Sequence, residues 1–229
     1  MALLEVKNLT KNFGGLTAVG DVSMELNEGE LVGLIGSNGA GKTTLFNLLT
    51  GVYEPSEGTV TLDGIVLNGK APYKIASLGL SRTFQNIRLF KDMTVLENVL
   101  VGLSNKQPSN FFASLLRLPK YYSSEEELKD KAMNSWLSLT WMVRQIRLRK
   151  TWLMEQQRHL EIVRALATEP KILFLDEPAA GMNPQETAEL TAHIRQIQKD
   201  FGITIILIEH DMSLVMDVTE RIYVWNTDA

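Results

Sequence analysis

Three apolar runs mark the segments that we expect to be buried strands. Residues 31–35, 171–175 and 203–208 are almost uninterrupted apolar sequence, and the last run is rich in β-branched side chains. Such runs are typical of strands that are covered on both faces in a parallel sheet. Residues 185–199, between the second and third runs, have the helical spacing of a crossover connection. The pattern therefore predicts an α/β protein with a parallel sheet.

The segments around this core follow other periods. Residues 3–26 alternate short apolar runs with polar turns, and residues 59–64 have the pattern of a further strand pair, so we expect antiparallel strands there. Helical spacing is found at residues 94–103 and again from residue 125 onward. The middle of the chain is therefore predicted to form a helical lobe.

A glycine-rich segment after the first apolar run fits the phosphate-binding pattern G-x-x-x-x-G-K-[ST]. At a strand-to-helix turn, glycines let backbone N–H groups surround a phosphate, and the helix N-terminus adds positive partial charge. Lys42 can reach the β- and γ-phosphates, and the Thr43 hydroxyl can coordinate Mg²⁺. A glycine-rich turn with a chance Lys-Thr pair is the alternative, and the flanking strand and helix argue against it. The predicted nucleotide-binding residues here are Gly36, Ser37, Asn38, Gly39, Ala40, Gly41, Lys42, Thr43 and Thr44.

Acidic and histidine side chains follow two of the predicted strands. Asp176 and Glu177 come directly after residues 171–175, at the carboxyl end of a strand, where parallel α/β sheets bind their ligands. We interpret them as a Walker B pair, with Asp176 holding Mg²⁺ and Glu177 accepting a proton from the attacking water. A solvated or helix-capping acid pair is the alternative. His210 follows another strand, and its position there predicts a γ-phosphate-sensing role, although a lone histidine is usually a surface group.

Composition narrows the class of protein further. The chain has 229 residues, of which 45% are hydrophobic, enough to bury a substantial core. A formal net charge of −4 gives no electrostatic reason to expect nucleic acid as a partner. The chain has no cysteine, so it forms no disulfide, which suits a reducing compartment. It shows no signal-peptide pattern and no apolar run of about 18 residues, so we expect it to reach any membrane only through partners.

Taken together, these segments resemble the ATP-binding subunits of ABC transporters, and among them those of branched-chain amino-acid importers. The resemblance covers most of residues 1–133 and 157–224. Its further matches are Phe13 at the place of the aromatic residue that stacks on adenine, Gln85 as the Q-loop glutamine, the loop at residues 180–183, and His210 as the switch histidine.

The resemblance implies a P-loop NTPase fold of the ABC ATPase type, with a mixed sheet core, an antiparallel β subdomain and a helical subdomain at about residues 86–165. These parts would form one ABC ATP-binding domain over residues 1–229 that binds and hydrolyses Mg-ATP. The implied catalytic residues are Glu177, His210 and Gln85, and the implied Mg²⁺ ligands are Thr43, Gln85 and Asp176.

The same resemblance implies partners and a location. Two such subunits close around two ATP molecules, so we expect a second ATP-binding subunit, with a heterodimer favoured and a homodimer left open. We also expect transmembrane permease subunits and a peripheral position on the cytoplasmic face of the cell membrane.

One motif departs from the family pattern. Counting back from residues 164–166 places the LSGGQ-type signature at residues 152–156, which here read Trp-Leu-Met-Glu-Gln. Glu155 would bring negative charge toward a polyphosphate, where the family offers a hydroxyl and close backbone donors. This departure leaves open a non-catalytic or impaired nucleotide-binding module. A separate alternative is a soluble ABC-type ATPase that serves no transporter.

The stretch before that motif also fits the family poorly, and the family usually continues past residue 229. The poorly fitting stretches contain all four tryptophans: Trp136, Trp141, Trp152 and Trp225. The basic side chains there could form an amphipathic surface that meets a membrane or a partner. The alternatives are a solvated helical face and a sequence altered by engineering or by error. The basic residues are Arg144, Arg147, Arg149 and Lys150.

Overall fold

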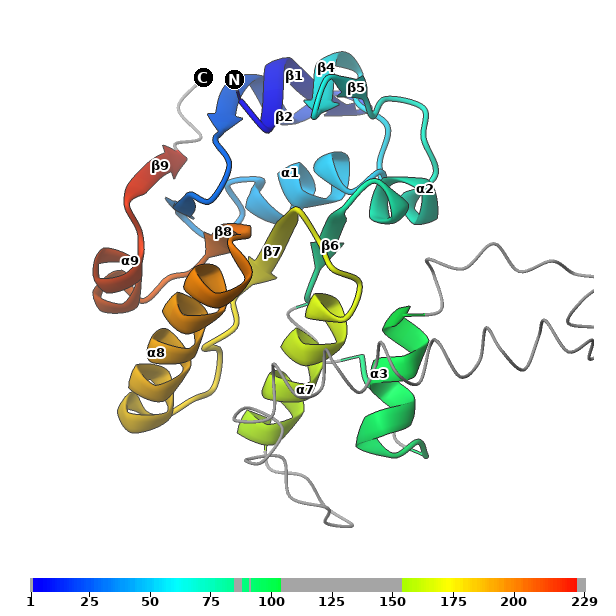
Figure 1. The fold of residues 1–229 in the computed structure, drawn as a ribbon. Coiled ribbons are helices and arrows are strands. Elements are labelled where there is room, and N and C mark those ends of the chain that lie inside the picture. Colours follow the sequence, from blue (N-terminus) through cyan, green and yellow to red (C-terminus); the bar gives the residue numbers. More distant parts are fainter. Residues whose placement is uncertain (1, 85–87, 91, 104–153, 226–229) are drawn as a thin grey trace, which may run out of the picture. The chain divides into compact units, whose positions relative to one another are not determined.

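The computed structural model describes residues 2–84, 88–90, 92–103 and 154–225 (Figure 1). The chain divides into two compact units, Met1–Gln85 with Pro170–Ala229, and Asn86–Glu169. Several predictions fall outside the described residues: Gln85, Leu153, the basic residues from 144 to 150, Trp136, Trp141 and Trp152.

The first unit contains a five-stranded parallel sheet with the order β6-β7-β8-β3-β9. Its strands are β3 (Leu31–Gly36), β6 (Leu80–Arg82), β7 (Ile172–Asp176), β8 (Thr204–Ile208) and β9 (Arg221–Trp225). Every residue of β7 and β8 is buried, as are the first four residues of β3. Burial on both faces explains why the three apolar runs lack a polar alternation, and the predicted parallel sheet is confirmed.

A four-stranded antiparallel sheet has the order β2-β1-β4-β5. Its strands are β1 (Leu4–Phe13), β2 (Leu16–Leu26), β4 (Glu57–Leu62) and β5 (Ile65–Val66). In β1 the buried side chains change from even to odd positions after Val6, because the register shifts between Val6 and Leu9. Asn8, with a φ of 47°, lies at this irregularity. The predicted antiparallel strands are thus confirmed, with a bulge that the alternation did not reveal.

Helix α1 (Lys42–Leu49) lies between the two sheets in Figure 1. One apolar cluster includes Leu4 and Leu62 of the antiparallel sheet, Phe46 of α1, and Phe174 and Ile206 of the parallel sheet. The rings of Phe46 and Phe174 meet edge to face, with centroids 4.8 Å apart. Helix α1 is therefore held by packing on both sides, and this positions the phosphate-binding segment that precedes it.

Helix α8 (Pro184–Phe201) forms the predicted crossover, and its ends carry clear sequence signals. The Asn183 side chain accepts hydrogen bonds from the N–H groups of Gln185 and Glu186, and the Glu186 side chain accepts from the Asn183 N–H. Gly202 ends the helix in the left-handed conformation. The two shorter helices of this unit are α2 (Pro72–Ser77) and α9 (Met212–Val218).

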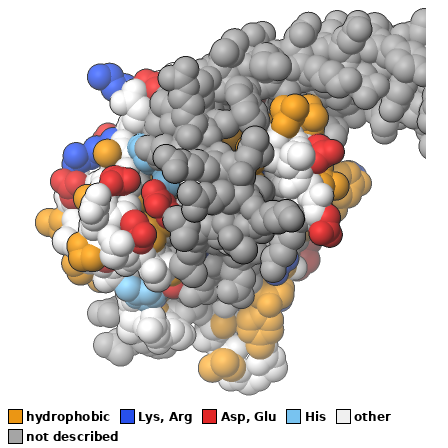
Figure 2. Space-filling model, turned by 90° about the horizontal axis from the view of Figure 1, so that it is seen from below, with side chains coloured by type: hydrophobic (Ala, Val, Ile, Leu, Met, Phe, Trp, Pro, Cys, Tyr) orange, Lys and Arg blue, Asp and Glu red, His pale blue; other side chains and the backbone are white. Residues whose placement is uncertain are grey.

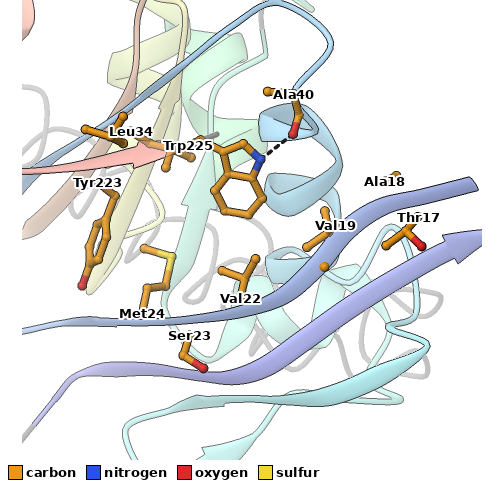
Figure 3. Close-up of a pocket in the computed structure, with 12 residues that line it drawn as sticks. Thr17, Ala18, Val19, Val22, Ser23, Met24, Leu34, Ala40, Tyr223 and Trp225 are labelled. Carbon is orange, nitrogen blue, oxygen red and sulfur yellow. Dashed lines mark hydrogen bonds between the residues drawn. The ribbon is translucent and has the colours of Figure 1, made fainter. Parts of the chain in front are cut away.

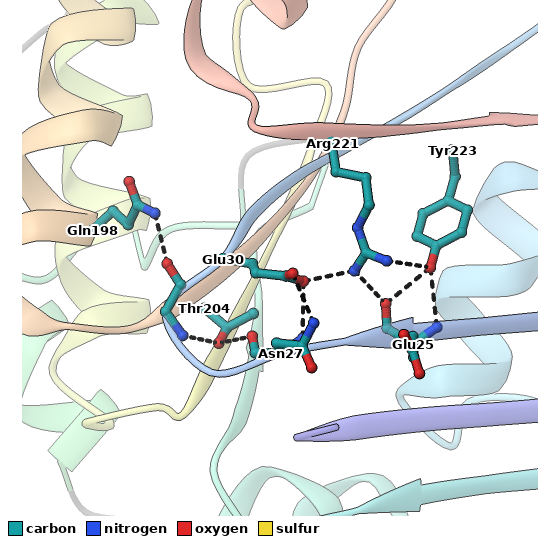
Figure 4. A network of polar contacts seen from close by, with 8 residues as sticks. Glu25, Asn27, Glu30, Gln198, Thr204, Arg221 and Tyr223 are labelled. Atoms are coloured by element: carbon teal, nitrogen blue, oxygen red, sulfur yellow. Dashed lines mark hydrogen bonds and ion pairs between the residues drawn. The ribbon is translucent and has the colours of Figure 1, made fainter. Parts of the chain in front are cut away.

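A polar network joins β9 to the connection between β2 and β3 (Figure 4). Arg221 forms a 2.6 Å ion pair with Glu30 and donates to the Glu25 carbonyl oxygen at 2.8 Å. Burial acts to raise the pKa of Glu30, but hydrogen bonds from Asn27 and Arg221 outweigh it, so the pKa is lowered. The Thr204 hydroxyl donates to the Asn27 carbonyl oxygen at 3.0 Å. These contacts anchor the edge strand that ends beside the phosphate-binding segment.

In the second unit, α3 (Val95–Leu103) packs on α7 (Met154–Leu166). A Cβ at Gly102 would lie 2.6 Å from the Arg164 carbonyl oxygen, so only glycine allows this approach of the two helices. Thr94 and Glu97 cap the start of α3 through reciprocal hydrogen bonds of 2.7 Å and 3.2 Å. The predicted helical spacing of residues 94–103 is confirmed.

On the face shown in Figure 2, acidic, basic and apolar side chains are interspersed over the described atoms. Among the described residues, no helix combines the length and apolar character that crossing a lipid bilayer requires.

Candidate functional site

The phosphate-binding segment forms the turn between β3 and α1. Gly41 is the N-cap residue of α1 and has a φ of 94°, and Gly39 has a φ of 82°. Side chains rarely tolerate this conformation. A Cβ at Gly41 would also lie 2.2 Å from the carbonyl oxygen of Ala18 in β2. Ser37 and Asn38 are exposed, so this part of the loop is open to solvent while its end at Gly41 is tightly packed.

The Lys42 ammonium is held by the loop itself. Its Nζ donates to the carbonyl oxygens of Gly36 at 2.7 Å and Ser37 at 2.8 Å. Burial lowers the pKa of Lys42, and the negative charges of Glu177 and Asp176 oppose that shift. The cation therefore sits among weak neutral acceptors, and phosphate oxygens are stronger partners for it.

Thr43 and Thr44 occupy the first turn of α1, directly after Lys42. Thr43 is exposed, and Thr44 is partly buried. A hydroxyl at this position is a hard oxygen donor, the type of ligand that Mg²⁺ prefers.

The predicted acid pair lies at the carboxyl end of β7. Asp176 is buried, and its Oδ2 accepts a hydrogen bond of 2.6 Å from Arg82 Nη2. Glu177 has a φ of 47°, a left-handed conformation that is uncommon for a residue with a side chain. Its N–H donates to the Ile208 carbonyl oxygen at 2.9 Å. The strained backbone of Glu177 is therefore pinned to the end of the neighbouring strand β8.

The structure brings His210 and Glu177 together. His210 Nε2 lies 3.0 Å from Glu177 Oε1, although the two residues are 33 positions apart in the sequence. The Glu177 side chain is 18% exposed, and that of His210 is 40% exposed. Two predicted catalytic side chains thus form a hydrogen-bonded pair that solvent can reach.

Sequence reasoning missed Glu209, which is buried at the end of β8. One carboxylate oxygen accepts from the Ala179 N–H at 2.7 Å, and the other accepts from the His210 N–H at 3.2 Å. Burial raises the pKa of Glu209, although these two hydrogen bonds oppose the shift. The available signal in the sequence was an acid that directly continues an apolar run. A carboxylate buried there needs hydrogen-bond donors, which the N–H groups of Ala179 and His210 provide.

Phe13 ends β1 and is 43% exposed. Its ring meets Tyr53 edge to face, with centroids 5.4 Å apart, and Lys11 Nζ lies 5.2 Å from its centroid. After the turn that follows Phe13, β2 leads to Ala18, whose carbonyl oxygen faces Gly41 of the loop. An exposed aromatic ring therefore stands one short strand segment away from the loop.

The loop at residues 180–183 precedes α8. Gly181 has a φ of 79°, the N–H of Met182 donates to the Ala179 carbonyl oxygen at 3.0 Å, and Asn183 caps the helix. The hydrogen bond from Ala179 to Glu209 ties the start of this loop to the end of β8.

Part of the departing motif is described, in the second unit. The last three of its residues begin helix α7, and Glu155 lies in the first turn. An acid there favours the helix through its dipole, but it also places negative charge at the helix end that otherwise attracts anions.

Trp225, the last residue of β9, contacts the phosphate-binding segment (Figure 3). Its indole Nε1–H donates to the Ala40 carbonyl oxygen. Gly36 pairs with Trp225 across β3 and β9, and a Cβ at Gly36 would lie 2.5 Å from the Trp225 carbonyl oxygen. A cavity of about 280 Å³ opens beside the indole, lined in part by Val19, Val22, Met24 and Leu34. Of the predicted nucleotide-binding residues only Ala40 lines it, so this cavity is separate from the phosphate cradle.

A glycine-rich loop between a buried parallel strand and a helix, with acids at the end of a neighbouring strand, defines a nucleotide-binding α/β protein. The family model described as ABC transporter matches residues 19–180. The protein named high-affinity branched-chain amino acid transport ATP-binding protein BraF, from Pseudomonas aeruginosa, is 47% identical over 99% of this chain and 89% of its own length. LivG of Salmonella typhimurium, named in the same words, is 48% identical over 98% of this chain and 88% of its own length.

Solved structures of ABC transporter cassettes match the fold of this chain. The nucleotide-free form of an ATP-binding cassette from an ABC transporter superposes with a TM-score of 0.81 at 32% identity, over 99% of this chain and 88% of that one. The ADP conformation of a cassette gives a TM-score of 0.81 at 31% identity, with the same coverage. The chain belongs to the ABC transporter family and is an ATP-binding subunit of the ABC ATPase type. The predicted fold class is confirmed.

Proposed function

We propose that this chain binds and hydrolyses Mg-ATP to energise a membrane importer of branched-chain amino acids. The observation that carries the proposal is the pair formed by Glu177 and His210, at the strand ends beside the loop that holds Lys42. The names of the relatives supply the class of solute, because no feature of the described site residues selects an amino acid.

Nucleotide binding would use three features of the chain. The exposed Phe13 ring offers a surface on which adenine can stack. The loop backbone and the N-terminus of α1 offer N–H donors to phosphate oxygens. Lys42 would exchange its two carbonyl acceptors for the β- and γ-phosphates, and an ammonium binds a charged phosphate oxygen more strongly than a neutral carbonyl oxygen.

The donor set fits Mg²⁺. The Thr43 hydroxyl and the Asp176 carboxylate are hard oxygen ligands, and Gln85 would add an amide oxygen. When bound, Mg²⁺ neutralises charge that develops on the transferred phosphoryl group. Arg82 supplies a positive charge next to Asp176.

Hydrolysis would depend on Glu177 as the acceptor of a proton from the attacking water. The left-handed backbone and the hydrogen bond to Ile208 hold this carboxylate at the edge of the sheet. His210 would orient it through the 3.0 Å contact and would face the γ-phosphate. Gln85, which lies outside the described residues, completes the proposed catalytic set.

The proposed partners are a second ATP-binding subunit and transmembrane permease subunits, which would place the chain peripherally on the cytoplasmic face of the membrane. A dimeric solved cassette shows that chains of this fold can pair. A heterodimer is favoured because Glu155, in the first turn of α7, would oppose a polyphosphate in both sites of a homodimer. The same observation supports the second candidate function, a nucleotide-binding module with impaired catalysis.

Glu177→Gln tests the proposal, because the amide keeps the shape of the side chain but cannot accept the proton. We expect ATP affinity within about twofold of the parent and turnover lowered by about 10²- to 10⁴-fold in the presence of partner subunits. Glu189→Gln, an exposed acid on α8, is the matched control and should leave both quantities unchanged.

Turnover of Glu177→Gln equal to that of the parent would remove Glu177 from the catalytic role. A parent that binds ATP but shows no turnover, alone or with partners, would instead support the impaired module.

A further inference from the structure

The guanidinium of Arg82 bridges the two elements that carry the proposed Mg²⁺ ligands. Arg82 ends β6, and its Nη2 donates to Asp176 Oδ2 at 2.6 Å, at the end of β7. Its Nη1 donates to Asn47 Oδ1 at 2.7 Å. Asn47 belongs to α1, the helix whose first turn contains Thr43. One side chain thus joins the strand of one proposed ligand to the helix of the other.

This bridge is held firmly. The side chains of Arg82 and Asp176 are 6% and 4% exposed. The ring centroids of Phe46 and Phe84 lie 5.4 Å and 5.2 Å from the guanidinium carbon of Arg82. A buried ion pair persists only with good geometry and further hydrogen bonds, and the contact to Asn47 provides one. The guanidinium therefore has little freedom to turn, and the carboxylate that it holds shares that restriction.

The contact leaves half of the Asp176 carboxylate available. In the described part of the chain, Oδ2 accepts from Arg82, whereas no group donates to Oδ1. Mg²⁺ demands near-ideal octahedral geometry at short distances, so a ligand that can rotate binds it less well. We propose that Arg82 is a positioning residue for the metal, which fixes the Asp176 carboxylate relative to α1 and thereby to Thr43. This inference rests on the proposed binding of Mg-ATP by Asp176 and Thr43.

The role requires arginine and not only a positive charge. The planar fork of arginine directs two amino groups at once, one to Asn47 and one to Asp176. Lysine keeps the charge but concentrates its donors at one point on a flexible chain. Arg82→Lys therefore changes the orientation of Asp176 while it leaves the local charge the same.

The test compares ATP affinity with excess Mg²⁺ and with EDTA, by calorimetric titration of each variant. The dissociation constant in EDTA divided by that in excess Mg²⁺ measures how much the metal contributes to binding, separately from the phosphate loop. For Arg82→Lys we expect the ratio to fall by about tenfold, with ATP affinity in EDTA within about twofold of the parent. Asn47→Ala removes only the second anchor, and we expect a fall of about threefold.

Arg195→Lys is the matched control, because Arg195 forms a 3.1 Å pair with Asp217 that is more than half exposed. It should leave the ratio unchanged. An unchanged ratio in Arg82→Lys, or equal losses of affinity with Mg²⁺ and with EDTA, would overturn the inference and assign Arg82 a purely structural role. If Arg82→Lys fails to fold, an unchanged ratio in Asn47→Ala overturns it equally. A parent whose ATP affinity does not depend on Mg²⁺ would contradict the proposed metal ligands themselves, and the inference with them.

Discussion

Lys42→Ala separates the contribution of the phosphate loop to binding from its contribution to folding. Among the described residues, the ammonium donates hydrogen bonds only to the carbonyl oxygens of Gly36 and Ser37, and burial lowers its pKa. A lowered pKa means that the folded state holds this charge less favourably than the unfolded state does. The variant should therefore unfold at nearly the same denaturant concentration as the parent.

Binding should respond very differently. ATP offers Lys42 charged phosphate oxygens in place of neutral carbonyls, and such a contact contributes about 1.5–3 kcal/mol. The loss corresponds to a dissociation constant about 10- to 150-fold higher. Calorimetric titration with ATP measures it, and Lys74→Ala, an exposed lysine in α2, serves as the control.

Two results would contradict this reasoning. ATP affinity of Lys42→Ala within about twofold of the parent would mean that the segment between β3 and α1 is not the phosphate site. A large loss of stability would mean that the Lys42 contacts hold the loop together, contrary to the direction of its pKa shift.

Two further predictions concern groups that the sequence pattern did not explain. Because the pKa of Glu209 is raised, the folded state keeps its proton to higher pH than the unfolded state, so this group lowers stability as pH rises from about its ordinary value of 4.5. Glu209→Gln lacks that loss, and urea unfolding between pH 4.5 and 7 should show the variant gaining relative to the parent as pH rises. A parent-to-variant difference that does not vary with pH would show that the burial of Glu209 has little effect. Leu153→Ser combined with Glu155→Gly should raise ATP turnover of the chain alone and with a partner subunit, and no gain in either setting would show that residues 152–156 are not the signature.

The elements buried on both faces were predictable from the sequence. Residues 172–175 of β7 and residues 204–208 of β8 lie within the apolar runs, because each side chain there meets a covered face. The loop before α1 was predictable because its glycines serve a local backbone conformation, as the φ of Gly41 shows. Residue type and local spacing were sufficient for these features.

Contacts between distant segments were not predictable in this way. Arg82 and Asp176 are 94 positions apart, and their pairing depends on β6 lying beside β7, an order that no local pattern encodes. The burial of Glu209 depends in the same way on a distant group, the Ala179 N–H, which lies 30 positions away in the sequence. The left-handed backbone of Glu177 likewise follows from its attachment to β8, because its own side chain gives no preference for that conformation.

The hydrogen bond from the Trp225 indole to the Ala40 carbonyl gives the phosphate loop an optical signal of its own. Indole emission depends on the hydrogen bond and polarity at the ring nitrogen, so a change in the loop when Lys42 leaves its carbonyl partners would alter it. With the other tryptophans removed by Trp136→Phe, Trp141→Phe and Trp152→Phe, the fluorescence of Trp225 alone would follow nucleotide binding in real time. Trp225, which ends β9 and contacts the loop, therefore makes the kinetics of nucleotide binding measurable without an attached dye.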